Sequence, residues 1–285
     1  MKITNIHNLP SPLVEAVRQD SYSRGDSKYS VSDLWAPARQ VRLVRQHDAD
    51  LSRDVMDSLW SIFGRSVHSI LDKFASEGVV NEHRLFYELD GVKLSGQFDR
   101  LIYANNTLQD YKVTSASSLV FDSRSKEWAA KMNTYRWLLA KNGLQVDNLQ
   151  AVAILRDWSK RESKRNKDYP LYPVVVLDLP VWDLSLTEQE VRKRLADLES
   201  PTLPLCSDEE RWIRETVWAV MKQDRKSAVK LFDRESDAVD FISMSPEGKK
   251  LYVQERPARA IRCEEYCDVS RVCEQWKNDP RNVET

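Results

Sequence analysis

The sequence predicts an α/β protein followed by a smaller lobe of different character. Three observations lead to this expectation. Segments of helical and strand periodicity alternate over residues 55–198, which is typical of α/β proteins. Hydrophobic residues make up 41% of the chain, enough for a substantial core. All four cysteines lie beyond residue 203, where the pattern changes. We therefore expect a core at residues 1–202 and a cysteine-bearing lobe at residues 203–285.

The first half of the core is predicted to be a long helix followed by strands. Before it, short elements are broken by the polar stretch Asp20–Lys28. Apolar residues then recur at three- and four-residue spacing from Val55 to Phe74, which predicts a helix. The turn signals Asp90-Gly91 and Asn105-Asn106 separate the strands that follow.

The second half of the core repeats this alternation. Residues Glu127–Lys141 have helical periodicity, and Gly143 is a plausible stop. Residues 150–155 and 172–179 are expected to be apolar strands separated by the charged loop Ser159–Asp168.

A last core helix is predicted at Thr187–Leu198. Thr187 and Glu190 have the spacing of a capping box at its start. From Leu203 onward the chain has mixed helix and strand character and lacks long apolar runs. We expect this part to fold as a separate lobe.

Composition narrows the possible locations and partners. The 43 basic and 44 acidic residues leave a net charge of −1, so nucleic-acid binding would depend on a local basic surface. No stretch approaches the ~18 apolar residues that span a bilayer. The first residues lack the apolar run of a signal peptide, which predicts a cytoplasmic location. In a reducing compartment the cysteines are expected to be ligands or buried thiols.

The predicted strands place acidic residues on one face of the sheet. A two-residue turn at Asn105-Asn106 puts Asp99 opposite Lys112, with Asp110 on the same face because side chains alternate. The turn at Asp90-Gly91 puts Glu82 opposite Asp99 by the same reasoning.

Such a group of carboxylates favours a bound cation. Neighbouring carboxylates repel unless a divalent metal or a proton neutralises them, and oxygen ligands select Mg²⁺ or Mn²⁺. A lysine beside the metal can orient a water or stabilise charge on a phosphate. The alternative is an amphipathic sheet whose charged face is simply solvated.

Four motifs give the core a family resemblance. Gly96-Gln97-Phe98-Asp99-Arg100, followed by Asp110-Tyr111-Lys112, is similar to the G-x-x-D…D-x-K signature of PD-(D/E)XK nucleases. Gly64-Arg65-Ser66-Val67-His68 matches the upstream helical motif of the RecB-like branch. The downstream Q-x-x-x-Y motif of that branch corresponds to Lys131-Met132-Asn133-Thr134-Tyr135, in which lysine replaces glutamine. The resemblance implies a restriction-endonuclease-like core, with a central mixed sheet flanked by helices.

The resemblance also implies roles for these residues. It implies Mg²⁺ or Mn²⁺ held by His68, Asp99, Asp110 and the main-chain carbonyl of Tyr111, with Lys112 activating the attacking water. The reaction would hydrolyse phosphodiesters to a 5′-phosphate and a 3′-hydroxyl. Glu82 is a further candidate on the register alone. The candidate catalytic residues are Lys112, Asp99, Asp110, Glu82, Tyr135 and Lys131.

The cysteines predict a metal or cluster site in the C-terminal lobe. Cys263, Cys267 and Cys273 are spaced C-x3-C-x5-C, and Cys206 lies upstream. Four thiolates can hold Zn²⁺ or an iron–sulfur cluster, and four buried free thiols are the third alternative. The absence of a C-x2-C pair disfavours zinc. The segments Arg256-Pro257, Arg262-Cys263 and Tyr266-Cys267, with Pro204-Leu205-Cys206-Ser207 upstream, resemble the cluster region of phage-type RecB-like exonucleases. This resemblance implies a structural [4Fe–4S] cluster bound by all four cysteines.

Two further features are candidates for nucleic-acid contact. The segment from residue 160 to 167 carries five basic residues and one acidic residue, and could bind a phosphate backbone or be a solvated hairpin tip. Its candidate contact residues are Lys160, Arg161, Lys164 and Arg165. Four aromatic residues could stack on bases or belong to the core: Trp128, Tyr135, Trp137 and Trp158.

Three functional hypotheses follow. The first is a DNA exonuclease acting on single strands or DNA ends in phage replication, recombination or repair, in a bacterium or a phage-infected host, with a possible recombination or replication protein as partner. The second is a nucleic-acid-binding module that has lost catalysis, which Lys131 favours. The third is an unrelated interaction protein stabilised by zinc or iron. The oligomeric state is left open.

Overall fold

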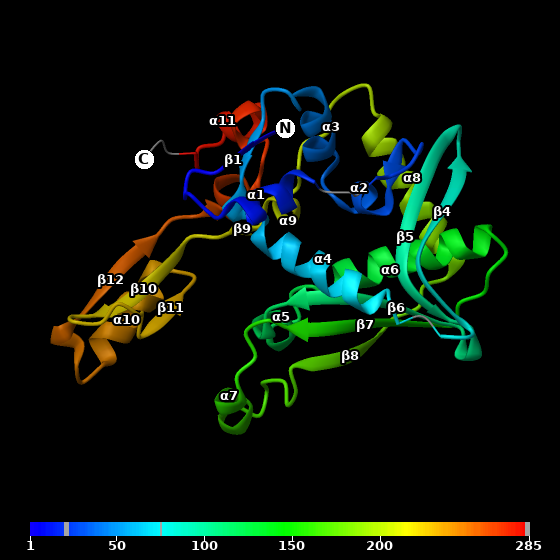
Figure 1. Ribbon diagram of the computed structural model, residues 1–285. Coiled ribbons are helices and arrows are strands. Elements are labelled where there is room, and N and C mark those ends of the chain that lie inside the picture. Colours follow the sequence, from blue (N-terminus) through cyan, green and yellow to red (C-terminus); the bar gives the residue numbers. More distant parts are fainter. Residues whose placement is uncertain (20–22, 75, 283–285) are drawn as a thin grey trace. The chain divides into compact units, whose positions relative to one another are not determined.

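The computed structural model describes residues 1–19, 23–74 and 76–282 and divides the chain into two compact units (Figure 1). Unit one comprises Met1–Arg42 and Asp48–Pro204, and unit two comprises Leu43–His47 and Leu205–Thr285. Of the polar stretch Asp20–Lys28, residues 20–22 lie outside the described part of the chain.

A mixed six-stranded sheet forms the centre of unit one. Two of its strand pairs are parallel, β2 with β5 and β6 with β7, and the others are antiparallel. The strand order is β2 (Tyr29–Ser30), β5 (Val92–Ile102), β6 (Thr107–Thr114), β7 (Asn148–Leu155) and β8 (Val174–Leu179), and β4 (Val79–Leu89) also pairs with β5. The predicted α/β class with a central mixed sheet flanked by helices is confirmed.

The flanking helices bury the sheet unequally. Helix α6 (Ser125–Lys141) contacts β4, β5 and β7, and its Met132, Trp137, Leu138 and Leu139 are fully buried in the core. Helix α4 (Leu59–Leu71) contacts β6 but has no fully buried residue. The other helices of unit one are α1 (Ser11–Arg18), α2 (Val31–Trp35), α3 (Ala38–Gln46, which continues into unit two), α5 (Ala116–Val120), α7 (Lys160–Arg165) and α8 (Leu184–Glu199), and a parallel pair, β1 (Lys2–Thr4) and β3 (Ser52–Asp54), completes it.

The helix predicted from Val55 to Phe74 is divided. Val55–Ser58 forms a 3₁₀ turn before α4, because the Asp54 side chain accepts a hydrogen bond from Met56 N and caps this turn. The predicted helix Glu127–Lys141 is confirmed as α6, and Gly143 follows it with a left-handed φ of +79°. The charged loop after β7 contains the short helix α7.

The predicted capping box at Thr187 is wrong. Helix α8 begins at Leu184, and the Asp183 side chain caps it by accepting from Ser185 N at 2.7 Å. Thr187 is buried inside the helix and donates its hydroxyl hydrogen to the Asp183 carbonyl. Asp183 is the cap because it directly precedes the first turn of the helix, whose N–H groups have no acceptor within the helix.

The predicted register is correct at one turn and wrong at the other. Leu89 pairs with Val92 across Asp90-Gly91, as expected. In the second hairpin Ile102 pairs with Thr107, so the turn has four residues, not two. Continuing this register brings Asp99 level with Asp110, not Lys112. Because the shift is even, Asp99, Asp110 and Lys112 keep their common face.

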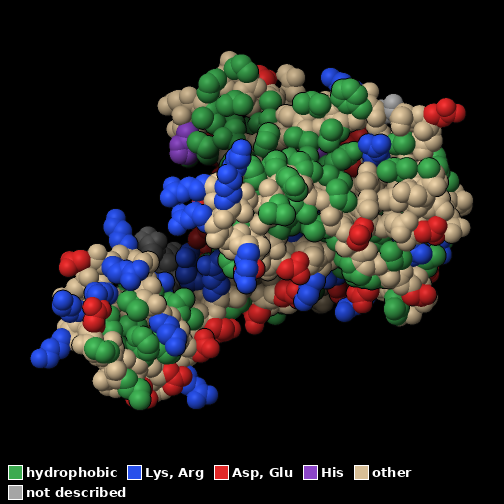
Figure 2. Space-filling model, turned by 90° about the horizontal axis from the view of Figure 1, so that it is seen from below, with side chains coloured by type: hydrophobic (Ala, Val, Ile, Leu, Met, Phe, Trp, Pro, Cys, Tyr) green, Lys and Arg blue, Asp and Glu red, His purple; other side chains and the backbone are tan. Residues whose placement is uncertain are grey.

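The edge strand β8 exposes apolar side chains. Seen from below, hydrophobic side chains gather on one face of the molecule (Figure 2). The exposed apolar residues of β8 and the segment before it are Leu171, Tyr172, Val174 and Val176.

Among the described residues, no helix combines the length and the apolar character needed to cross a membrane.

Unit two contains mixed helix and strand. Strand β10 (Val217–Lys222) pairs antiparallel with β11 (Lys230–Phe232) and β12 (Leu251–Arg256), and α10 (Glu235–Met244) packs on this sheet. The cysteines lie outside this sheet, among short elements: α9 (Asp208–Arg211), the pair β9 (Ile213–Arg214) and β13 (Arg259–Ala260), a π-helical turn at Arg262–Tyr266, a 3₁₀ turn at Ser270–Val272 and α11 (Glu274–Lys277).

Candidate active site

Three elements of unit one bring a histidine and two carboxylates together. His68 comes from α4, Glu82 from β4 and Asp99 from β5, and one ligand atom of each lies within 4.8 Å of the others. In the part of the chain that the structure describes, this is the one group of at least three His, Cys, Asp or Glu ligand atoms so close together.

His68 is the centre of this group. Its Nδ1 lies 3.1 Å from Glu82 Oε1 and 3.5 Å from Asp99 Oδ1, and its Nε2 lies 3.1 Å from the Tyr111 carbonyl oxygen. Burial acts to lower the pKa of His68, but the hydrogen bond to Glu82 and the charge of Asp99 outweigh it, so the pKa is raised. Both ring nitrogens therefore lie next to oxygen atoms that can accept a hydrogen bond and that are also of the type that binds a metal ion.

Asp99 and Asp110 bring two carboxyl groups close together in a buried region. Burial, followed by the charge of Asp110, raises the pKa of Asp99 to about 7. Asp99 also accepts a 2.6 Å hydrogen bond from Tyr111 N. Asp110 forms an ion pair with Lys112. Burial acts to lower the pKa of Lys112, but Asp110 and Asp99 raise it overall, so its ammonium stays charged.

Glu82 is held in an unusual backbone conformation. Its φ is +45°, between the pairs Asn81–Arg100 and His83–Phe98. A non-glycine residue in this region costs about 1–3 kcal/mol, and such residues cluster at functional sites. Gln97 donates a 2.8 Å hydrogen bond to Glu82, which fixes the carboxylate toward His68.

The donor set fits a divalent cation. It offers one imidazole nitrogen, carboxylate oxygens and a main-chain carbonyl, which suit Mg²⁺ or Mn²⁺. Asp110 Oδ2 is buried and has no hydrogen-bond partner among the described residues, its contact being the ion pair with Lys112. A cation here would neutralise carboxylates that otherwise repel each other.

Metal affinity is expected to rise with pH. A proton on Asp99, whose pKa is about 7, competes with the cation, and His68 acts in the same direction. Between pH 3.8 and about pH 7, Asp99 keeps its proton in the metal-free folded state but loses it in the unfolded chain. The stability that this retained proton gives the folded state is therefore lost as the pH rises through this range. Mn²⁺ titration by calorimetry should show roughly tenfold tighter binding at pH 8 than at pH 6.

Asp99→Asn is the control for this titration. It should weaken Mn²⁺ binding at both pH values and reduce its pH dependence. Affinity of the parent protein that does not change between pH 6 and 8 would contradict the assignment of Asp99 as a ligand.

Gly96 of the G-x-x-D motif is required by packing. A Cβ at this position would lie 2.7 Å from Leu138 Cδ1, 2.8 Å from Val31 Cγ2 and 2.9 Å from Tyr135 Cδ1. The ring of Tyr135, which lies beside Gly96, is half-buried and packs against the core.

Gly96→Ala is expected to lower the free energy of unfolding by about 1–3 kcal/mol, because the methyl group overpacks the core. Gly64→Ala is the matched control: it lies in α4 with nothing within 4 Å of its Cβ, and alanine favours helix, so it should be neutral or stabilising. Urea unfolding measures both, and equal stability of Gly96→Ala and the parent would contradict the packing argument.

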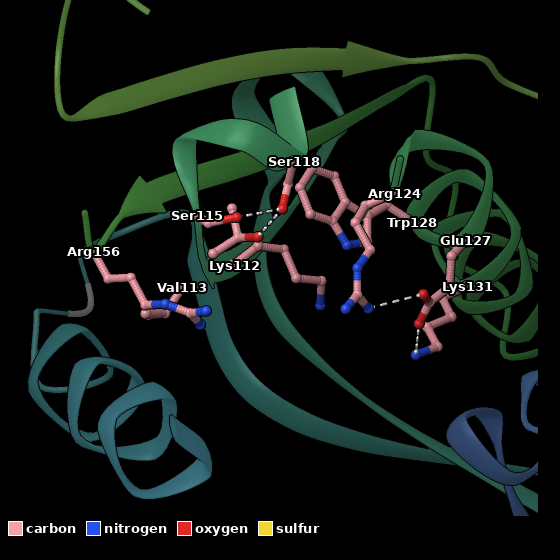
Figure 3. Close-up of a pocket in the computed structure, with 10 residues that line it drawn as sticks. Lys112, Val113, Ser115, Ser118, Arg124, Glu127, Trp128, Lys131 and Arg156 are labelled. Carbon is pink, nitrogen blue, oxygen red and sulfur yellow. Dashed lines mark hydrogen bonds and ion pairs between the residues drawn. The ribbon is translucent and has the colours of Figure 1, made fainter. Parts of the chain in front are cut away.

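Lys131 lies on α6 beside the site. Its ammonium is 2.8 Å from Glu127 Oε1, one helical turn away. Lys131 and Lys112 line the same pocket (Figure 3). The lysine at the glutamine position of the motif is therefore already engaged by a carboxylate.

The other candidates lie apart from this group. Trp128 and Trp137 are buried in the core, which favours the core alternative for both, and Trp128 also lines the pocket that contains Lys112. Tyr135 and Trp158 are half-buried against the same core. The candidate contacts Lys160, Arg161, Lys164 and Arg165 are exposed on α7, and among the described residues no ion pair or hydrogen bond joins them to the metal-site residues.

Sequence reasoning missed several side chains around the site. Gln97 and Arg84 form a chain to Glu82, since Arg84 donates to Gln97 Oε1 at 2.7 Å. These two residues pair across β4 and β5, so the register about Asp90-Gly91 could have identified them. Arg124 and Arg156 carry no comparable signal, because they join the pocket only through packing.

The four cysteines come together in unit two. Burial, then Glu210 and the other thiols, raises the pKa of Cys206 to about 12. Burial also raises the pKa of Cys267 to about 11, with Cys263 and Cys273 contributing. The Gln275 side chain bonds both the N–H and the carbonyl of Cys206 at 2.8 Å.

Comparison with known proteins places these features in a family. The profile of the PD-(D/E)XK nuclease superfamily matches residues 37–274. The crystal structure of SSO0001 is similar at 14% identity and a TM-score of 0.47, over 70% of this chain and 88% of that one. A phage related exonuclease from Haemophilus somnus 129PT is similar at 11% identity and a TM-score of 0.30, over 55% and 68%. No curated protein matches the chain.

Proposed function

The chain belongs to the PD-(D/E)XK nuclease superfamily, and from this premise we propose that it is a Mg²⁺- or Mn²⁺-dependent deoxyribonuclease acting on single-stranded DNA or DNA ends. Nucleases of this superfamily are typically metal-dependent hydrolases, and the fold suggests a nucleic-acid substrate. The observation that carries the proposal is the His68–Glu82–Asp99 group, with the Asp110–Lys112 ion pair on the same sheet face.

We assign the side chains the following roles. His68, Glu82 and Asp99 would hold the cation, with Asp110 and the main-chain carbonyl of Tyr111 as further ligands. When bound, the cation lowers the pKa of a water and neutralises charge on the scissile phosphate. Lys112 donates hydrogen bonds to the attacking water and to a phosphate oxygen. The water oxygen would bond to phosphorus and release a proton to solvent, the P–O3′ bond would break, and the 3′ oxygen would take a proton from solvent, leaving a 5′-phosphate and a 3′-hydroxyl.

The division of labour between the units is part of the proposal. We assign catalysis to residues 1–202 and a structural [4Fe–4S] cluster, of the RecB-like iron–sulfur type, to residues 203–285. The clustering of all four thiols supports the cluster, since buried thiols with raised pKa values need a cation to become thiolates.

The spacing of the cysteines along the chain supports a cluster over zinc, since the site lacks a C-x2-C pair of the kind that begins many structural zinc sites.

Digestion of end-labelled DNA tests the nuclease. Anaerobically purified protein is incubated with single- and double-stranded DNA and Mg²⁺ or Mn²⁺, and EDTA is the control. Metal-dependent shortening from one end supports the proposal, and the label position identifies the polarity. Folded protein that binds DNA and cuts neither substrate would instead support the binding module, for which the engagement of Lys131 by Glu127 is the structural argument.

The biological setting follows from the sequence resemblance. We propose action in phage replication, recombination or repair, in the cytoplasm, with a recombination or replication protein as a possible partner. The exposed basic helix α7 is proposed to contact the phosphate backbone through Lys160, Arg161, Lys164 and Arg165.

A further inference from the structure

A polar pocket lies beside the candidate metal centre and shares one residue with it. The pocket encloses about 260 Å³, close to the lower end of small-ligand sites, which begin at about 300 Å³. It is formed by the end of β6, by α5, by the first turns of α6 and by the residue after β7. Lys112 is the shared residue, and His68, Glu82 and Asp99 do not line it.

The pocket has an excess of positive charge. Arg124, Lys131 and Arg156 line it together with one carboxylate, Glu127. Glu127 binds Lys131 at 2.8 Å and Arg124 at 3.2 Å, so one negative charge is shared by two cations. In Figure 3 the nitrogen-bearing ends of Lys112 and Arg124 lie close together, and the guanidinium of Arg156 lies beside Val113, elsewhere in the lining of the same pocket.

Arg156 is the cation that no carboxylate neutralises. No ion pair of Arg156 exists among the described residues, and its guanidinium stacks on the Trp60 ring with 4.1 Å between carbon and centroid. Trp60 is 60% exposed on α4. The stacking holds the guanidinium in place while leaving its N–H groups free to donate.

Hydroxyl groups also line the pocket. Ser118 Oγ accepts from Thr114 Oγ1 at 2.9 Å and lies 3.0 Å from Ser115 Oγ. Guanidinium groups together with serine and threonine hydroxyls are the donors that proteins use for phosphate oxygens.

We propose that this pocket binds a phosphate of the nucleic-acid strand adjacent to the scissile phosphate, with Arg124 and Arg156 as its cations. The inference rests on the proposed function and deepens it. Lys112 reaches both places, so a strand whose scissile phosphate lies at the metal centre extends its neighbouring phosphate into the pocket. Trp60 is a positioning residue that acts through Arg156.

Binding and cleavage measured separately test the pocket. Arg124→Gln and Arg156→Gln are compared with Lys193→Gln, which removes one exposed positive charge from α8. Fluorescence anisotropy of a labelled single strand in EDTA reports binding without cleavage. Each pocket variant should bind about tenfold more weakly, and the slope of log affinity against log salt should fall by about 1. Inorganic phosphate should displace the strand from the parent protein and lose this effect in the double variant.

The kinetic arm separates positioning from chemistry. Both pocket variants should raise KM about tenfold and change kcat by less than about threefold. Comparing strands with 5′-phosphate and 5′-hydroxyl ends identifies the occupant: a preference for one end that the variants lose indicates a terminal phosphate, and equal losses indicate an internal one.

The two proposals fail differently. If the parent protein binds the strand and does not cut it, the nuclease proposal fails while the anisotropy comparison still decides the pocket. Pocket variants that bind like Lys193→Gln, or that lower kcat at unchanged KM, overturn the phosphate pocket.

Discussion

Replacing Lys112 with alanine is expected to lower kcat for DNA hydrolysis at least about a thousandfold, because its charged ammonium is the donor placed next to the metal carboxylates. The ion pair with Asp110 and the raised pKa keep this group protonated at neutral pH. Alanine removes the ammonium that pairs with Asp110 and that we assign to the attacking water. Initial rates on end-labelled single-stranded DNA measure the loss.

Two controls make this result specific. Lys126→Ala removes an exposed lysine from α6 and should keep the parental rate. Lys112→Ala leaves Asp110 buried without its cation, so circular dichroism must show that the variant is folded. If that variant is destabilised, Lys112→Met fills the same volume and repeats the test. Near-parental activity in a folded Lys112 variant would remove Lys112 from the mechanism.

Cys267→Ser is expected to bleach the visible absorbance and loosen unit two before unit one. Cys267 follows the π-helical turn and belongs to the group of four thiols. Metal–thiolate bonds contribute directly to the folding of such lobes. A loss of about 2 kcal/mol or more should lower the melting temperature of unit two by about 10 °C, because 1 kcal/mol shifts a domain of this size by roughly 4–8 °C.

Limited proteolysis with mass spectrometry locates the loosening, and iron analysis identifies the metal. New cleavage sites should fall within residues 206–273, while the sheet of unit one stays protected. Met244→Ser, at an exposed position of the same unit, should behave like the parent. A colourless parent protein that contains one zinc ion would overturn the cluster.

Strands β5 and β6 and the turn between them show what sequence patterns could and could not predict. The alternation of side chains along a strand placed Asp99, Asp110 and Lys112 on one face, and the face survived an error of two residues in the register. The length of the second turn was not predicted, because Asn105-Asn106 suits a two-residue type I′ turn with two left-handed residues, whereas in the structure only Asn106 of this pair has a positive φ, of +47°. The pairing of Ile102 with Thr107 within the folded sheet sets the length of this turn.

The sequence by itself determined the family motifs, the types of the main elements and the sheet face that carries the candidate metal residues, because these depend on residue order and local periodicity. Only the tertiary structure decided that Glu82 lies within hydrogen-bond distance of His68, that Glu127 engages Lys131, and that Arg124 and Arg156 share a pocket. The reason is physical: these side chains come from different elements, and their distances are set by how helices pack on the sheet, which no local pattern encodes.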